Sequence, residues 1–518
     1  MNFQMSKSER RLVSMMMVVV VFIFSVGCEN NILNPTGRST SLTEKNSFLE
    51  VADAAATGSG GQNETGDDFY PGIERHGELN YNAFVNTAED NLSTFGVDVD
   101  AGSYTFGRGK IMADQIPAPA SVRVEEYINY FRQDYTAPSE APFSVNLDGA
   151  PSPFRGDSLY LLRIGLQGRL QLEENLPWNL TFLVDVSGSM TSRMNLVKQS
   201  LDILVDNMRL GDQISICTYA SITQTVLNPT SLEAQDADAI KNIIAGLTAG
   251  GSTAMGAGLQ NAYQVNQLGF LENGVNRVIV CSDGDANVGG TTHEAILELI
   301  SDYVDQGITL STLGYGVGNY NDQLMEQLAD QGDGNNYYID TIEEARRLFT
   351  EELLGVLQVI AKDVKIQVEF NHAAVIRYRL IGYENRDIVD EEFENDETDA
   401  GDIGAGHRVT ALYELELHQA SSSPLGTVHL RYKLPQGETD IPVDYSIQRS
   451  HVSNDLSEAS NRFKFTAAIA EYAEILRQSP FASSSFSALE DIISATMDSE
   501  NDRDIELLQL IQHLQTID

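Results

Sequence analysis

Between residues 177 and 356, short apolar runs alternate with longer amphipathic segments, and this pattern constrains the fold most. We expect strands near Leu180–Val186, Gln213–Tyr219, Thr223–Leu227, Arg277–Ser282, Thr309–Gly314 and Tyr337–Ile339. We expect helices near Arg193–Met208, Glu233–Ala245, Ala254–Leu268, Thr292–Gln306, Asn321–Ala329 and Ile342–Leu354. Strands that are apolar on both faces and separated by amphipathic helices predict an α/β fold, with a mostly parallel sheet covered by helices on both faces.

The first of these strands ends in the sequence Asp-Val-Ser-Gly-Ser, which supplies Asp185, Ser187 and Ser189. One carboxylate and two hydroxyls are thus predicted on a loop at the carboxyl end of a buried strand, where open α/β sheets bind their ligands. Three short oxygen-bearing side chains at one point suit a hard divalent cation.

Two further loops are expected at the same edge of the sheet. One contributes Thr253, just before a predicted helix, and the other contributes Asp283, directly after a predicted strand. Asp285 is an alternative to Asp283, but the residue nearer the strand end is favoured. The sequence therefore predicts a metal site built from three loops.

The pattern of Asp-x-Ser-x-Ser, a distant Thr and a distant Asp resembles the metal-ion-dependent adhesion site (MIDAS) of von Willebrand factor type A domains. The resemblance implies that Ser187 and Ser189 bind the ion directly and that Thr253 binds it directly or through water. Asp185 and Asp283 would act largely through water or through hydrogen bonds to the ligands. The expected ion is Mg²⁺, with Mn²⁺ or Ca²⁺ as alternatives, because Mg²⁺ keeps waters and prefers octahedral oxygen ligands.

A site with so few direct carboxylates leaves one position of the ion open, which an Asp or Glu of a partner protein can fill. The resemblance thus implies a protein-binding module and not an enzyme. The alternative is a structural cell-envelope assembly protein, in which the ion only stiffens the loops.

The regions that flank this domain resemble bacterial YfbK-like type A proteins. The resemblance rests on the segments 92–100, 124–131, 162–168, 361–371 and 380–386. The flanks are expected to form an antiparallel, β-rich accessory unit followed by C-terminal helices. The expected organisation is a signal peptide at 1–28, a flexible tether at 29–87, an N-terminal accessory region at 88–172, the type A domain at 177–356, a β-rich region at 360–450 and helices at 455–518.

The N-terminus has the features of an export signal. A basic segment precedes the apolar run Leu12–Phe24, and Ser-Val-Gly-Cys follows it, ending at Cys28. The run is short for a membrane span, and small residues before a cysteine resemble a bacterial lipobox, although Ser25 replaces the usual aliphatic residue. We therefore expect a lipoprotein of the cell envelope, periplasmic or on the outer surface, that is held to a membrane by a lipid on Cys28. A plain signal peptide and an uncleaved anchor are the alternatives.

The charge of the chain limits its expected partners, and its few cysteines limit its expected disulfides. The 518-residue chain has 75 acidic and 33 basic residues and a formal net charge of −42, which argues against nucleic-acid binding. Apart from Cys28, the only cysteines are Cys217 and Cys281, both in apolar strand-like runs, and we expect them to be buried free thiols.

Competing catalytic and binding motifs are incomplete. The glycine-rich segment 314–319 lacks the third glycine of a dinucleotide loop, because Asn319 stands there. His293-Glu294 starts like a zinc-protease helix, but the next expected histidine is Leu297. Asp98–Asp100 and the acidic run 387–402 could bind Ca²⁺, but they match no EF-hand loop and are expected to be solvated turns.

Overall fold

In the computed structural model, the described residues are 76, 79–156, 158–170, 176–233, 237–284, 293–316, 320–352, 355, 357–418, 421–435, 437 and 439–517. They lie in the second of two compact units, residues 69–518. The predicted signal segment, Cys28 and most of the predicted tether lie outside the described residues.

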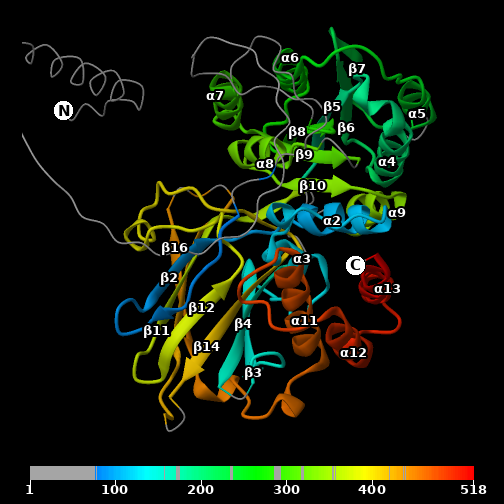
Figure 1. Cartoon of the computed structure of the whole chain (residues 1–518). Helices are drawn as coiled ribbons and strands as arrows, with labels where there is room; N and C mark the ends of the chain where they lie inside the picture. The colour runs from blue at the N-terminus through cyan, green and yellow to red at the C-terminus, as the bar shows by residue number, and fades with distance from the viewer. Residues whose placement is uncertain are drawn as a thin grey trace, which may run out of the picture. The chain divides into compact units, whose positions relative to one another are not determined.

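A six-stranded sheet occupies the middle of the chain (Figure 1). Its strands are β5 (Trp178–Asp185), β6 (Gln213–Tyr219), β7 (Thr223–Ser231), β8 (Val275–Ser282), β9 (Ile308–Tyr315) and β10 (Asn336–Ile339). The strand order is β10-β9-β8-β5-β6-β7, and only β7 is antiparallel to its neighbour. β5 is central and fully buried, as its continuous apolar sequence predicts.

Helices cover both faces of this sheet. One face packs against α4 (Met194–Asn207), α5 (Ala237–Ala245) and α9 (Ile342–Arg346), which a π-helical turn, Arg347–Glu351, extends. The other face packs against α6 (Met255–Leu268), α7 (His293–Val304) and α8 (Asp322–Gln331). Side chains of β5 alternate between the two cores, with Phe182 in one and Leu183 in the other. The predicted doubly wound fold is therefore confirmed.

The two flanks of this domain form one β-sandwich. One sheet has the order β1-β12-β14-β4-β3, and the other has the order β13-β11-β15-β16 with β2 also paired to β11. The bounds are β1 Val85–Asn86, β2 Leu92–Gly96, β3 Phe143–Pro151, β4 Leu159–Gly168, β11 Val359–Phe370, β12 Val375–Ile381, β13 Ile403–Gly404, β14 Arg408–Leu417, β15 Gly426–Lys433 and β16 Ile441–Ile447. All their pairings are antiparallel, and β2 and β4 from before the α/β domain pair with β11 and β14 from after it. The predicted antiparallel accessory unit is therefore confirmed, and the α/β domain is inserted within its sequence.

A layer of helices covers the outer face of the sheet that contains β4, β12 and β14. The helices are α2 (Gly102–Met112), α3 (Val124–Tyr130), α11 (Asn461–Leu476), α12 (Phe486–Thr496) and α13 (Asp502–Ile517). Short 3-10 turns occur at Pro119–Ser121, Ser189–Ser192, Asp390–Glu392, Arg449–His451 and Leu456–Glu458. These helices share a hydrophobic core with three side chains of the sheet, Leu161, Ile381 and Leu412. Among the described helices, none combines the length and the hydropathy that a membrane span requires.

Helix α2 joins the accessory unit to the α/β domain, since it runs along the edge strand β10. The Thr105 hydroxyl donates to the carbonyl of Tyr338 at 2.8 Å. The buried Arg108 pairs with Asp340 and Glu344 of the α/β domain and with Glu506 of α13. A helix along an otherwise open strand edge protects it from pairing with another chain.

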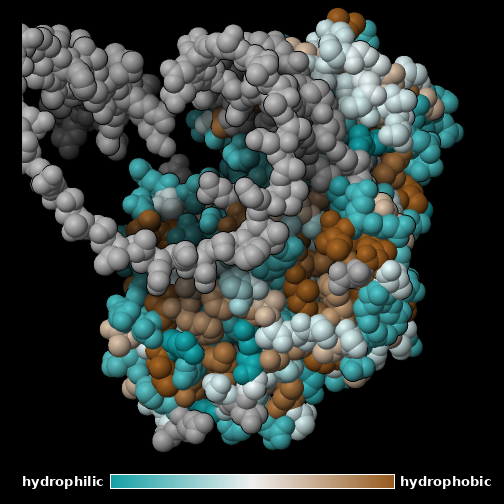
Figure 2. Space-filling model, in the orientation of Figure 1, coloured by the Kyte–Doolittle hydropathy of each residue, from teal (hydrophilic) through white to brown (hydrophobic). Residues whose placement is uncertain are grey.

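The surface seen in Figure 2 mixes hydrophilic residues with apolar patches of limited extent. Exposed large apolar side chains such as Met112, Leu210, Ile222 and Leu268 come from different elements. Cys217 and Cys281 are buried free thiols, as predicted, on the two strands that flank β5.

Candidate metal centre

The first loop of the site starts where β5 ends, at Asp185. This carboxylate is fully buried, and its Oδ1 accepts the backbone N–H of Ser187 at 2.8 Å. Its Oδ2 accepts the Ser282 hydroxyl, at the end of the neighbouring strand β8, at 3.1 Å. Asp185 thus fixes its own loop and ties it to β8.

The hydroxyls of Ser187 and Ser189 lie 2.9 Å apart and are hydrogen-bonded to each other. Two adjacent ligands of an octahedral ion with metal–oxygen distances of 2.0–2.1 Å are also separated by about 2.9 Å. The spacing of this pair therefore fits two neighbouring positions around Mg²⁺.

The second loop is attached directly to the first. The N–H of Gly250 donates to the Val186 carbonyl at 2.7 Å, and the N–H of Gly188 donates to the Gly251 carbonyl at 3.0 Å. Gly251 has a φ of +97°, which a residue with a Cβ rarely adopts, and a Cβ there would lie 2.8 Å from the Ser221 hydroxyl. Thr253 follows, half-buried and two residues before α6.

The third loop follows β8 and carries Asp283, which is fully buried. Its Oδ2 accepts a hydrogen bond from the Arg193 guanidinium at 2.9 Å, and the same nitrogen donates to the Ser189 carbonyl at 3.2 Å. Arg193 therefore links the first and third loops. A Cβ at Gly316, on the loop after β9, would lie 1.4 Å from the Arg193 Nε, so this glycine makes room for the arginine.

Electrostatics at this edge favour a cation. Burial raises the pKa of Asp185 to about 6, an effect opposed by hydrogen bonds from Ser187 and Ser282 and reinforced by the charge of Asp283. Two buried carboxylates therefore lie close together, and Arg193 pairs with Asp283. A bound divalent cation would relieve the repulsion between them.

The donor set fits a hard cation held mainly by hydroxyl and water oxygens. Within the described part of the chain, no group of three or more His, Cys, Asp or Glu side chains is placed to hold a metal ion. The oxygens that the three loops do offer come from serine hydroxyls and carboxylates, which are ligands that hard cations prefer.

Sequence reasoning did not identify Ser282, Arg193 or Ser221 as parts of the site. Ser282 donates to Asp185 and also accepts the N–H of Gly284 at 3.0 Å. Ser221 accepts the N–H of Ser252 at 3.0 Å and supports the second loop. The Ser-Asp-Gly turn after β8 was the available signal for Ser282, whereas no pattern in the sequence marks Arg193. Asp285 lies outside the described residues.

The described residues of the competing motifs form no second metal site of this kind. Asp98 and Asp100 are buried, so the expectation of a solvated turn there was wrong. Asp98 accepts the backbone N–H of Asp100 at 2.8 Å and pairs with Arg386 at 3.3 Å, which is a structural role. Residues 317–319 of the glycine-rich segment and the side chains of 293–294 lie outside the described residues.

Three family models match successive parts of the chain. Residues 179–351 match the family model described as von Willebrand factor type A domain, and residues 71–162 match one described as von Willebrand factor. Residues 355–517 match the model described as uncharacterized protein YfbK, C-terminal.

The uncharacterized protein YfbK of Escherichia coli K12 is 37% identical over 441 residues, which cover 79% of this chain and 75% of that protein. Human inter-alpha-trypsin inhibitor heavy chain H2 is 26% identical over 212 residues, which span 39% of this chain but only 22% of that protein. A solved structure of a von Willebrand factor type A protein from Catenulispora acidiphila aligns with a TM-score of 0.42 and 16% identity, covering 75% of this chain and 90% of that one.

The 37% identity runs through the inserted α/β domain and the flanks that pair around it. The chain therefore belongs to the YfbK-like family of von Willebrand factor type A proteins.

Proposed function

We propose that the three loops form a divalent metal site through which the type A domain binds an acidic group of a partner protein. The observation that supports this most is the pair of serine hydroxyls, 2.9 Å apart, beside a buried carboxylate. Von Willebrand type A domains are in general interaction modules, and the proposed role is binding and not catalysis.

The residues have distinct roles in this proposal. Ser187 and Ser189 supply two oxygens to the ion, and Thr253 supplies a third directly or through water. Asp185 and Asp283 balance the positive charge and orient the loops by accepting hydrogen bonds from Ser187, Ser282 and Arg193. Bound Mg²⁺, or Mn²⁺ or Ca²⁺ in its place, would offer its remaining position to a carboxylate of the partner.

Titration calorimetry of the full chain with Mg²⁺ tests the metal site. Ser187→Ala should weaken Mg²⁺ binding by about tenfold or more, because it removes a proposed direct ligand without adding bulk. Ser446→Ala removes an exposed hydroxyl of the distant strand β16 and is the matched control. Equal Mg²⁺ affinities in the two variants would contradict the assignment.

The partner is tested separately. Immobilised protein should capture its ligand from envelope extract in Mg²⁺ and release it in EDTA, and Ser187→Ala should capture none. If the wild type binds Mg²⁺ but captures the same proteins with and without EDTA, the structural alternative holds, in which the ion only stiffens the loops.

We also propose, from the sequence alone, that Cys28 carries a lipid that anchors the chain to a membrane of the cell envelope. Incorporation of labelled fatty acid into the wild type but not into Cys28→Ala would support the anchor. Equal labelling of both would contradict it.

A further inference from the structure

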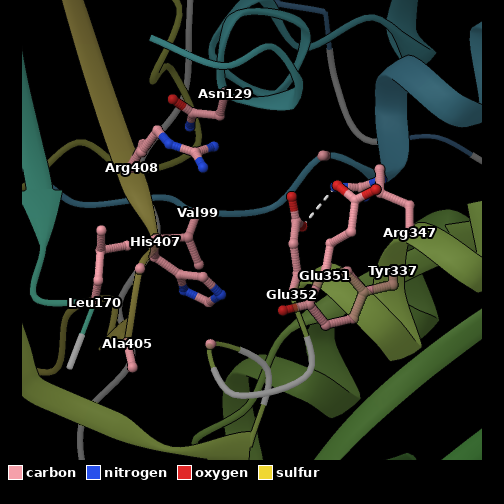
Figure 3. A pocket seen from close by; sticks show the side chains of 13 residues that line it. Val99, Asn129, Leu170, Tyr337, Arg347, Glu351, Glu352, Ala405, His407 and Arg408 are labelled. Carbon is pink, nitrogen blue, oxygen red and sulfur yellow. Dashed lines mark hydrogen bonds and ion pairs between the residues drawn. The ribbon is translucent and has the colours of Figure 1, made fainter. Parts of the chain in front are cut away.

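A cavity of about 150 Å³ lies where the type A domain meets the accessory unit, away from the three loops of the metal site (Figure 3). Arg408 and His407, at the start of β14, lie on one side of it, and Tyr337, Arg347, Glu351 and Glu352 of the type A domain lie on the other. The cavity therefore borders two parts of the fold that are built from separate segments of the chain.

Arg408 is the first unusual feature of this cavity. Among the described residues, no acceptor lies within hydrogen-bond or ion-pair distance of its guanidinium, and the residue is partly buried. Burial lowers the pKa of Arg408, and the charge of Glu352 opposes that effect while those of Arg132 and Arg503 reinforce it. Arg347, across the cavity, is by contrast paired with both Glu344 and Glu352. A bound anion would give Arg408 the partner that the described residues do not provide.

His407 adds a second donor. Its Nδ1 accepts the backbone N–H of Gly404 at 3.2 Å, so the proton of the neutral ring is on Nε2. Burial lowers the pKa of His407 to about 4, and the ring is therefore neutral near pH 7. Figure 3 shows the ring directed toward the cavity, and within the described residues Nε2 has no hydrogen-bond acceptor.

The hydroxyl of Tyr337 is a third hydrogen-bond donor. Its side chain is only 5% exposed, and its buried hydroxyl has no hydrogen-bond partner within the described structure. Buried polar groups are nearly always hydrogen-bonded, so a ligand oxygen within reach would be a favourable partner for this hydroxyl. The three side chains that carry these donors thus line one cavity.

The opposite wall limits the charge of a ligand. Burial alone would raise the pKa of Glu352, but the nearby Arg347 and Arg503 lower it to about 2, so this carboxylate is ionised. Glu351 is likewise paired with Arg132 and Arg503. Because these carboxylates are already paired with arginines, Arg408 supplies one further positive charge, which a singly charged anion would balance.

We propose that this cavity binds the carboxylate of a small organic monoanion, with Arg408, His407 and Tyr337 as its hydrogen-bond donors. An arginine and neutral N–H and O–H donors are the groups that recognise carboxylates. Val99, Ala101 and Ala405 provide an apolar lining for a short alkyl chain. Because the ligand would bridge the type A domain and the accessory unit, its binding stabilises their junction.

Thermal unfolding and calorimetry of the full chain with sodium propionate test this site, with sodium chloride at the same ionic strength as the reference. Propionate should raise Tm in a concentration-dependent way, with millimolar affinity. Arg408→Gln should weaken propionate binding by about tenfold or more, whereas Arg377→Gln, which removes an arginine from a partly exposed pair on β12, should leave it unchanged.

Tyr337→Phe separates a binding role from a structural one. It removes only a hydroxyl that has no described partner, so the ligand-free protein should unfold at the same temperature or a higher one. Its propionate affinity should nevertheless fall severalfold. A lower Tm without ligand, together with unchanged affinity, would contradict the proposal.

Alanine and phosphate complete the test. Alanine carries the same three-carbon acid with an added ammonium group, and binding by either acid supports a carboxylate site and shows which form the facing Glu351 and Glu352 prefer. Binding of phosphate but of neither acid would overturn the carboxylate assignment. No effect of propionate, alanine or phosphate beyond that of chloride, or an equal propionate effect in Arg408→Gln, would overturn the site itself.

Discussion

Two regions of this molecule bury carboxylates, and they neutralise them differently. At the junction around α2, Asp340 and Glu344 both pair with Arg108, and Glu344 pairs also with Arg347. At the edge of the sheet, the described contacts of Asp185 come from an amide and hydroxyl groups, and Asp283 pairs with Arg193. Paired carboxylates join parts of the fold, whereas incompletely neutralised carboxylates beside hydroxyls are suited to a cation.

The largest expected effect is at the junction. Arg108→Met should lower the free energy of unfolding by about 3–5 kcal/mol, because it leaves the buried Asp340 without its cation and removes one of the two cations that pair with Glu344. Denaturant unfolding measures this loss. Arg377→Met, in the partly exposed pair with Glu416, is the control and should change it by at most about 1 kcal/mol. Equal losses would mean that burial does not distinguish the two pairs.

Removing a carboxylate charge at the proposed metal site should lower metal affinity and leave stability unchanged. Asp185→Asn keeps the size of the side chain but removes a buried charge, so metal-free stability should be maintained. Mg²⁺ affinity should fall by at least about tenfold, because the charge that attracts the ion is lost. Unfolding in EDTA and titration with Mg²⁺ give the two values, and a stability loss without an affinity loss would place Asp185 with the junction carboxylates.

A third region buries the carboxyl group of Asp402, which has fewer neighbouring cations and hydroxyls than the carboxylates of the other two regions. Asp402 accepts the N–H of Asp363 at 3.1 Å, and its other oxygen is buried with no hydrogen-bond partner within the described structure. Burial raises the pKa of Asp402 to about 8, the nearby Lys362 opposes this, and the charges of Asp333 and Asp363 add to it.

The raised pKa of Asp402 lowers the stability of the folded chain as pH rises. Between pH 3.8 and about 8 the unfolded chain loses the Asp402 proton while the folded chain keeps it, so this group costs stability as pH rises. Asp402→Asn should therefore raise Tm by a few degrees at pH 8 and by less at pH 4. A difference in Tm that is independent of pH would contradict the raised pKa.

The smallest expected effect is at Arg193, the cation that pairs with Asp283 at the proposed metal site. Arg193→Gln removes a positive charge beside Asp283, and Mg²⁺ affinity should increase severalfold, since two unit charges at 4 Å interact by about 1 kcal/mol even in water. Titration with Mg²⁺ measures the change. A decrease would mean that Arg193 acts mainly by positioning Asp283.

The α/β domain could be predicted from sequence because its signals are local. The apolar run of β5 and the helical periodicity of α4 both identify elements whose cores the structure confirms. The first and third site loops followed from strand ends in a parallel sheet, and the second from its place before a predicted helix. The structure joins the first two through Gly188 and Gly251 and the first and third through Arg193.

Helix α2 could not be predicted in this way. Its sequence contains Gly102, Gly107 and Gly109, and each glycine costs about 1 kcal/mol relative to alanine in a helix. A Cβ at Gly107 would lie 2.1 Å from the Tyr127 hydroxyl, so close packing against α3 explains this glycine. The helix predicted to extend to Leu354 ends as an α-helix at Arg346 and continues as a π-turn, where Arg347 pairs with Glu344 and Glu352. Such tertiary contacts leave no periodic signal in the sequence.

Anomalous diffraction from crystals of the protein grown with Mn²⁺ tests the central claim most directly. A peak is expected about 2.0–2.2 Å from the hydroxyl oxygens of both Ser187 and Ser189, at the edge of the six-stranded sheet. A strong peak at the acidic cluster around Asp402, with none at the two serines, would contradict it.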